Sequence, residues 1–317
     1  MTFANVTHVA VGVVLNDQDQ VLVSQRHPGS HKGGLWEFPG GKKESHETIE
    51  MALQREFREE LGITPVTFYP FTKILHHYPE KSVLLDVWVI SEFNGIAEGK
   101  EGQAIDWRDL SSLNPADFPE ANAAIIKRIR LPRDVAITPN LDSIEKVVAL
   151  FELYAKQNVQ LVQFRQTQLD SDEYSNWYGK VKTIAQSLQM KLMANQSIDT
   201  FPSELADGFH ANSQTLMRLE NRPVTSSKLF SASCHNLGEL AHAQKVDADF
   251  VTLSPVNPSE KYRAGAELGW DQFSKLAAQV SLPVYALGGV GSEHMELARS
   301  SGAFGIAGIT AYLNPRL

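Results

Sequence analysis

The chain has 317 residues, 43% of them hydrophobic, and a formal net charge of -8. That length accommodates two domains, and the acidic balance disfavours a grip on a nucleic acid backbone. The single cysteine, Cys234, excludes an internal disulfide and a cysteine metal cluster, which fits a reducing cytoplasm. We find neither a basic leader nor an apolar stretch long enough to cross a bilayer, so we expect a cytoplasmic protein without a membrane partner.

The first domain is expected to span residues 1–131. Two β-branched runs, 8–15 and 21–26, flank a polar turn and predict a β-hairpin. Further strands and one helix are expected at 67–76, 82–92, 105–107 and 122–130. This order predicts an α+β domain, an α/β/α sandwich around a mixed sheet.

An acidic helix is expected within residues 41–63. Residues three and four apart share a helix face, so Glu56, Glu59 and Glu60 project together. Gly62 follows them, where a left-handed conformation commonly ends a helix. The apolar stripe that anchors the helix consists of Ile49, Ala52, Leu53 and Phe57. The three like charges repel one another, and a divalent cation such as Mg2+ or Mn2+ removes that repulsion.

The spacing over this segment resembles the Nudix box. Gly41 is followed after five residues by Glu47, and after seven more by the run Arg55-Glu56-Phe57-Arg58-Glu59-Glu60-Leu61-Gly62-Ile63. The resemblance implies that the three glutamates bind metal against a diphosphate. Arg55 lies beside them and can orient a carboxylate through a two-pronged hydrogen bond. The alternative is a solvated acidic helix face.

Three more segments resemble the MutT branch of that family, the 8-oxo-dGTP diphosphatases. They are residues 35–42, 99–103 and 117–122, the last with Glu120 in place of a proline. The resemblance implies that the Gly40 carbonyl is a metal ligand, and that Glu101 is a further ligand or the base for water. It also implies nucleotide contacts by Arg26, Phe38 and Asn122.

Each of these roles has an ordinary structural alternative. Asn122 is also a candidate helix N-cap, Phe38 a candidate core residue and Glu101 a candidate solvated side chain. Trp36 suits core packing and base stacking equally. The resemblance implies water attack at the β-phosphorus of a nucleoside triphosphate, with Mg2+ or Mn2+ as cofactor. The expected products are 8-oxo-dGMP and pyrophosphate, an activity that removes a DNA-damaging nucleotide.

The second domain is expected to span residues 134–317, after a junction at 129–133. Short apolar runs alternate there with amphipathic ones. Eight strands are expected at 135–137, 159–164, 191–194, 208–210, 229–233, 250–253, 284–287 and 305–308, and helical runs separate most of them. This alternation predicts a (β/α)8 TIM barrel, with a doubly wound sheet as the alternative.

Functional residues of such barrels follow the carboxyl ends of the strands. Those positions hold Gln163, Arg165, Asn195, His210, His235, Ser254, Lys261, Gly288, Gly289 and Thr310. The arrangement resembles thiamin phosphate synthase and its thiazole tautomerase relative, which implies a thiamin-pathway phosphate as ligand. The two adjacent glycines suit phosphate binding through backbone amides, or only a tight turn.

Two departures from the synthase pattern concern its metal ligands. An Asn-Asp pair is replaced by Asn195-Gln196, and a second aspartate is missing around residues 213–215. Ionisation of a pyrimidine diphosphate needs metal at the leaving group, so we do not expect synthase activity. Proton transfer by His235 stays open. So do a ligand-binding role that regulates the hydrolase and hydrolysis of a thiamin-pathway diphosphate by the first domain.

Overall fold

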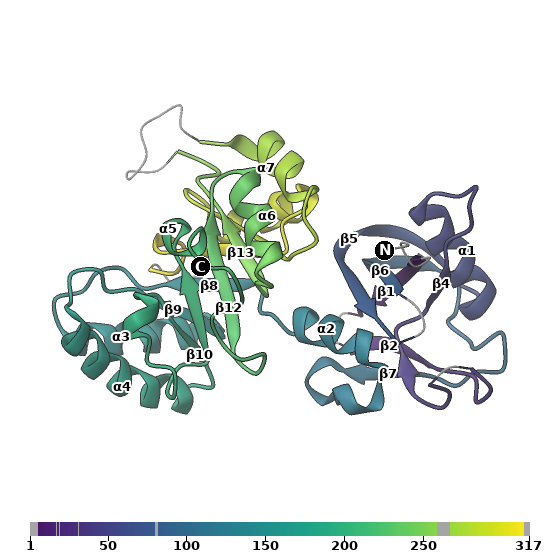
Figure 1. The fold of residues 1–317 in the computed structure, drawn as a ribbon, viewed down its shortest axis with the longest axis horizontal. Helices are drawn as coiled ribbons and strands as arrows, with labels where there is room; N and C mark the ends of the chain where they lie inside the picture. The colour runs from purple at the N-terminus through teal and green to yellow at the C-terminus, as the bar shows by residue number, and fades with distance from the viewer. Residues whose placement is uncertain are drawn as a thin grey trace. The chain divides into compact units, whose positions relative to one another are not determined.

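The computed structural model describes residues 6–313 except 17, 19, 31, 80–81 and 259–266. The chain divides into two compact units, Met1–Leu131 and Pro132–Leu317 (Figure 1). Within the described ranges, no helix combines the length and the apolarity needed to cross a membrane.

The first unit is built on two sheets. One sheet has the strand order β4-β1-β6-β5 and is mixed, because β1 runs parallel to β6 and antiparallel to β4. The other has the order β3-β2-β7 and is antiparallel. The strands are β1 (Val6–Val14), β2 (Gln20–Gln25), β3 (Trp36–Glu37), β4 (Gly40–Lys42), β5 (Thr64–His77), β6 (Ser82–Asn94) and β7 (Ile105–Asp109). The mixed sheet agrees with the prediction.

The predicted hairpin of the first two strands is wrong. Strand β1 is paired on both sides, by β4 and by β6, so it has no free edge for β2. Only an isolated bridge between Leu15 and Val21 joins the two strands. Beyond that bridge β2 pairs with β7 and β3 in the second sheet. Pairing with strands far along the chain therefore overrides the local turn signal.

Helix α1 (Ile49–Leu61) carries the acidic motif and is fixed at both ends. The Thr48 side chain accepts a hydrogen bond from the Met51 backbone, and Gly62 ends the helix at a φ of 69°. The left-handed glycine was predicted. The face that packs into the core buries Ala52, Leu53, Phe57 and Leu61. Glu56 and Glu60 lie at the edge of this stripe and are half-buried, whereas Glu59 is exposed.

Helix α2 (Glu120–Ile129) begins at a proline. Pro119 occupies the N-cap position and makes no side-chain capping bond. Asn122 is the third residue of the helix, so its alternative reading as the N-cap is wrong. Two short 3-10 turns, η1 (Leu110–Ser112) and η2 (Pro115–Asp117), lead into this helix.

The second unit is a closed barrel of eight parallel strands, as predicted, and the doubly wound alternative is wrong. The strands are β8 (Asp134–Ile137), β9 (Leu161–Phe164), β10 (Lys191–Ala194), β11 (Gly208–Ala211), β12 (Leu229–Cys234), β13 (Phe250–Leu253), β14 (Val284–Leu287) and β15 (Gly305–Gly308). Neighbouring strands pair in chain order, and the sheet closes because β8 pairs with both β9 and β15.

Helices cover the outside of the barrel strands (Figure 1). They are α3 (Ile144–Lys156), α4 (Ser171–Ser187), α5 (Ser213–Leu216), α6 (Leu237–Lys245), α7 (Gly269–Ala277) and α8 (Met295–Ser300), with 3-10 turns η3 (Ile198–Thr200), η4 (Ser292–His294) and η5 (Thr310–Tyr312). Side-chain caps begin several of them: Ser143 caps α3, and Asp170 forms a capping box with Glu173 at α4. The resulting core joins the outward-facing side chains of the strands to these helices.

Candidate functional site

Arg55 organises the acidic face of helix α1. Its Nη2 and Nε donate to Glu47 at 2.7 and 3.1 Å, a two-pronged pair. Its Nη1 donates to Glu56 at 2.9 Å and to Glu59 at 3.2 Å. The predicted two-pronged bond therefore exists, but its partner is Glu47. Arg55 brings Glu56 and Glu59 together and offsets part of their mutual repulsion.

Glu60 lies in a separate, strongly acidic environment. Burial raises the pKa of Glu60 to about 8, with the charges of Glu56, Glu37 and Glu101 acting in the same direction and a backbone hydrogen bond from Gly40 opposing them. The structure thus places Glu101, which lies on a distant loop, within electrostatic reach of the helix. A buried carboxyl group with three acidic neighbours is a site where positive charge is strongly favoured.

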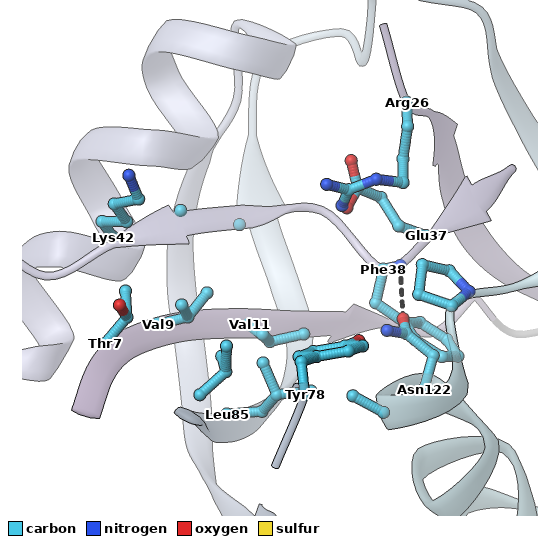
Figure 2. A pocket seen from close by; sticks show the side chains of 15 residues that line it. Thr7, Val9, Val11, Arg26, Glu37, Phe38, Lys42, Tyr78, Leu85 and Asn122 are labelled. Atoms are coloured by element: carbon cyan, nitrogen blue, oxygen red, sulfur yellow. Dashed lines mark hydrogen bonds and ion pairs between the residues drawn. The ribbon is translucent and has the colours of Figure 1, made fainter. Parts of the chain in front are cut away.

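A cavity of about 210 Å³ opens beside this cluster. Gly40, Gly41 and Lys42 line one part of it, and Phe38 and Asn122 line another (Figure 2). The remaining lining residues are Thr7, Val9, Val11, Arg26, Glu37, Tyr78, Val83, Leu85, Pro119 and Ala121. Most of the wall is thus apolar strand surface, with a small number of polar groups, as is typical of sites for small organic ligands.

Asn122 and Phe38 form the polar corner of the cavity. The Asn122 side-chain oxygen accepts a hydrogen bond from the Phe38 backbone N–H at 3.4 Å (Figure 2). The Phe38 ring is buried and stacks on Phe118 at a centroid distance of 5.7 Å. Phe38 is therefore both a core residue and a wall residue. Trp36 does not line the cavity; the Arg108 guanidinium covers its ring at 4.0 Å.

Arg26 and Glu37 lie side by side in the cavity wall and form an ion pair (Figure 2). Burial raises the pKa of Glu37, and the Arg26 charge opposes that shift. Glu37 also acts electrostatically on Glu60, so it is within reach of the carboxylate cluster as well as of Arg26.

Glycines allow the cavity floor to approach helix α1. A Cβ atom on Gly41 would lie 2.1 Å from the carboxyl carbon of Glu56, so any side chain there would displace the carboxylate. Gly40 has a φ of 146°, and a Cβ atom there would lie 2.0 Å from the Ala10 carbonyl oxygen. The spacing of the motif therefore has a steric reason, which is contact between the β4 backbone and the acidic side chains.

His235, at the mouth of the barrel, has a carboxylate partner. The His235 Nδ1 lies 2.9 Å from the Glu239 carboxylate, which also accepts the His235 backbone N–H at 2.7 Å. About a third of the His235 side chain is exposed. The Glu239 contact orients the ring and leaves Nε2 on the other side, the arrangement of an oriented general base.

The other predicted residues of the barrel mouth occupy different environments. Arg165 follows β9, and its backbone N–H donates to the Thr138 hydroxyl at 2.8 Å. The Asn195 backbone N–H is held by the Tyr174 hydroxyl at 3.1 Å. Both are half-buried. Lys261 lies outside the described residues.

Gly288 and Gly289 have φ angles of 93° and 61°. Their carbonyl oxygens accept hydrogen bonds from Asn257, through its backbone at 2.9 Å and its side chain at 2.9 Å. A Cβ atom on Gly288 would lie 2.9 Å from the Pro255 Cα. Close approach of residues 255–258 is thus a sufficient reason for both glycines, with or without a bound phosphate.

Comparisons with known proteins divide the chain in the same way. A NUDIX domain model matches residues 10–128, and a thiamine monophosphate synthase model matches residues 135–312. The chain belongs to both families. Relatives of the first part include the 8-oxo-dGTP diphosphatase of Escherichia coli K12, which is 38% identical over 122 residues and covers 38% of this chain and 95% of the relative. The CTP pyrophosphohydrolase of the same organism is 33% identical over 129 residues and covers 39% of this chain and 96% of the relative. A thiamine-phosphate synthase of Desulfitobacterium hafniense DCB-2 is 29% identical over 158 residues (49% and 76%).

The Nudix domain has the donor chemistry for a divalent cation. No group of three His, Cys, Asp or Glu side chains in the described part of the chain is already arranged around a metal position. Arg55 donates to Glu56 and Glu59. The carboxylate oxygens near Glu60 are nevertheless hard ligands that Mg2+ prefers. Burial and the charges of Glu56, Glu37 and Glu101 raise the pKa of Glu60, so a cation beside it would favour its ionised form. The residues present therefore fit a divalent cation.

The thiamine monophosphate synthase domain places His210 differently from the prediction. His210 was expected at the barrel mouth, but it is enclosed within the barrel. Its ring nitrogens contact the hydroxyls of Ser231 and Ser233, each at 2.8 Å, and Gln163 Nε2 at 3.1 Å. Burial lowers the pKa of His210 to about 3, with the Arg165 charge acting in the same direction. His210 is therefore a neutral hydrogen-bonding residue of the interior.

Three residues of the Nudix domain site had no predicted role. Glu47 is a fixed position of the motif, but it lies in the loop before helix α1. Its pairing with Arg55 therefore could not be predicted from helix spacing. Glu37 is adjacent to Phe38 in the segment that resembles MutT. Tyr78 lines the cavity from the end of β5, far from any motif, and nothing in its sequence surroundings indicates this.

Proposed function

We propose that the Nudix domain hydrolyses 8-oxo-dGTP to 8-oxo-dGMP and pyrophosphate. One observation carries the proposal: a single cavity is lined by Asn122 and by Gly40 and Gly41, and Gly41 abuts the Glu56 carboxylate. A nucleotide with its base at Asn122 reaches the acidic face of helix α1 with its phosphates. The similarity to the Escherichia coli 8-oxo-dGTP diphosphatase supports this substrate.

The base is proposed to bind beside the Asn122 amide, whose oxygen accepts from the Phe38 N–H. An amide side chain donates and accepts at once, so it can distinguish the edge of an oxidised guanine from that of guanine. Asn122 is buried, and a wrong base edge would leave its polar atoms without partners in a water-poor site. Arg26, held by Glu37, is proposed to contact the nucleotide from the opposite wall.

The proposed metal ligands are the Gly40 carbonyl, Glu56, Glu59, Glu60 and Glu101. A bound Mg2+ or Mn2+ supplies neutralisation of the phosphate charge and activation of water. Arg55 keeps Glu56 and Glu59 side by side, and Glu47 holds Arg55 in place. Glu101 is exposed and near Glu60, which suits a further ligand or the acceptor of the proton from water.

The test is pyrophosphate release with Mg2+ from 8-oxo-dGTP, dGTP, CTP and thiamin-type diphosphates. We expect a strong preference for 8-oxo-dGTP that is lost in Glu56→Gln. Glu50→Gln is the matched control, because Glu50 lies in the first turn of the same helix. Equal turnover of all nucleotides would refute the substrate, and turnover of thiamin-type diphosphates alone would assign the domain to the metabolism of its fused barrel.

A second candidate function concerns the thiamine monophosphate synthase domain. The contact between Glu239 and His235 Nδ1 favours proton transfer at the barrel mouth, as in a thiazole tautomerase. Synthase activity is not proposed, because the positions of both metal-binding aspartates hold other residues. The test is proton–deuterium exchange into thiazole phosphates with His235→Asn as the control. Binding without exchange would indicate a ligand-binding module instead.

A further inference from the structure

Tyr78 is the one aromatic phenol in the cavity wall, and no motif includes it. It follows strand β5 directly, and its ring lies beside Asn122 in the cavity (Figure 2). The ring packs edge-on against His76, with 4.4 Å between the centroids. These contacts hold the ring in the cavity wall.

The first turn of helix α2 has no side-chain acceptor at its N-cap. The first backbone N–H groups of a helix have no partner within the helix, and a side chain at the N-cap usually accepts one of them. Here the N-cap is Pro119, which has no such side chain. The Asn122 N–H donates to the Pro119 carbonyl at 2.9 Å, and the Ala121 N–H donates to the Tyr78 hydroxyl.

The position of Asn122 depends on that first turn. Its side-chain oxygen makes a hydrogen bond of 3.4 Å to the Phe38 N–H, which is long for a bond of this kind. The helix backbone must therefore do most of the positioning. Ala121 directly precedes Asn122, so loss of the acceptor for the Ala121 N–H would loosen the residue that carries the amide.

We propose that Tyr78 is a positioning residue of the nucleobase site, whose hydroxyl caps helix α2 and thereby sets the Asn122 amide for the base. This inference rests on the proposed function. Tyr78 lies outside helix α2, so the inference adds a residue of another segment to those that recognise the base. The phenol oxygen accepts the capping bond through a lone pair and keeps its own proton, because burial raises the pKa of Tyr78.

The test removes one oxygen atom by Tyr78→Phe and keeps the ring. Loss of a helix cap corresponds to a change of about 3- to 30-fold. We expect KM for 8-oxo-dGTP to rise by that factor, kcat to stay within about two-fold, and the preference over dGTP to fall in parallel. Amide exchange at Ala121 should accelerate. Tyr69→Phe, in the preceding strand β5 and outside the cavity wall, is the matched control.

A second variant separates capping from direct contact with the nucleotide. Pro119→Ser gives the N-cap its own acceptor, so it should make the Tyr78 hydroxyl redundant. In a double-mutant cycle, the effect of Tyr78→Phe on KM should shrink to less than half in the Pro119→Ser background. An undiminished effect would overturn the positioning role, because the hydroxyl would then act on the nucleotide itself.

The outcome for Tyr78 is distinguishable from the outcome for the proposed substrate. If the wild-type protein shows no preference for 8-oxo-dGTP, the substrate proposal fails. The same variants are then compared on the nucleoside triphosphate that the protein does hydrolyse. An unchanged KM and unchanged amide exchange at Ala121 in Tyr78→Phe would overturn the inference in either case.

Discussion

Arg55 and Glu47 form a two-pronged ion pair, with nitrogen–oxygen distances of 2.7 and 3.1 Å. Glu47 is buried, and its second role is to accept the Glu44 backbone N–H at 2.7 Å. The hydrogen bonds from Arg55 lower the pKa of Glu47 to about 2, so it stays charged. Glu47 therefore serves the carboxylate cluster indirectly, by fixing the arginine that holds Glu56 and Glu59.

Glu47→Gln should impair catalysis without removing any proposed metal ligand. The neutral amide cannot hold Arg55 with two charge-assisted bonds, so the guanidinium can turn towards Glu56 and Glu59. We expect kcat/KM for 8-oxo-dGTP to fall by about 10- to 100-fold and more Mg2+ to be needed for half-maximal rate. Steady-state kinetics at several Mg2+ concentrations measure both. Glu44→Gln, in the same loop, is the control, and an equal loss there would contradict this role.

Local patterns account for the parts of the fold that the sequence predicted. The apolar stripe of helix α1 and the left-handed Gly62 follow from spacing over a few residues, and so do the eight buried barrel strands. The hairpin was mispredicted because β1 pairs with β4 and β6, contacts that span long stretches of chain. Turn chemistry at residues 16–20 carries no information about those partners.

The same distinction applies to the site. Glu56, Glu59 and Glu60 belong to one helix, so their common face could be predicted. Tyr78 and His210 could not be placed, because their environments are made by other segments: helix α2 for Tyr78 and strand β12 for His210. The strand pattern around His210 is compatible with a side chain at the barrel mouth and with one inside the barrel. Only closure of the barrel determines which of these positions the side chain takes.

Asn122→Ala should remove discrimination between nucleotides more than it reduces turnover. The substitution deletes the amide and leaves the Phe38 N–H without its acceptor. We expect kcat/KM for 8-oxo-dGTP to fall by roughly a hundredfold and that for dGTP to change much less. Asn114→Ala is a suitable control, because Asn114 caps η2 and does not line the cavity. Parallel losses for both nucleotides would argue against base recognition by Asn122.

Glu60→Gln should stabilise the metal-free protein and reduce its response to Mg2+. Without a cation, burial and the charges of Glu56, Glu37 and Glu101 make ionisation of Glu60 unfavourable in the folded protein. An amide has no such cost, so unfolding of the metal-free variant should require roughly 1–3 kcal/mol more. Calorimetry with and without Mg2+ measures this, since a bound cation stabilises the native state in proportion to its affinity. A variant with the same Mg2+-dependent shift as the wild type would exclude Glu60 as a ligand.

His210 should make the barrel less stable at acid pH. Its folded pKa of about 3 lies below the ordinary value of 6.5, so the unfolded chain binds a proton that the folded chain does not. Its contribution is therefore complete above pH 6.5 and is lost as pH falls from 6.5 towards 3, by at most about 1.4 kcal/mol per unit. Denaturant titrations of wild type and His210→Gln between pH 7 and pH 4 should show the shallower dependence in the variant. Parallel curves would mean that His210 can gain its proton inside the barrel.

Gly288→Ala tests whether close packing is the reason for the glycine. The added Cβ would lie 2.9 Å from the Pro255 Cα, at a φ of 93° that side chains rarely adopt. Gly302→Ala is the matched control, because Gly302 has a φ of 86° and a Cβ there meets nothing within 4 Å. Both should lose about 1 kcal/mol of stability from backbone strain, and Gly288→Ala about 1–2 kcal/mol more from the contact. Since denaturant unfolding in phosphate-free buffer excludes any phosphate ligand, equal losses in the two variants would indicate that packing does not require Gly288 and would favour a binding role instead.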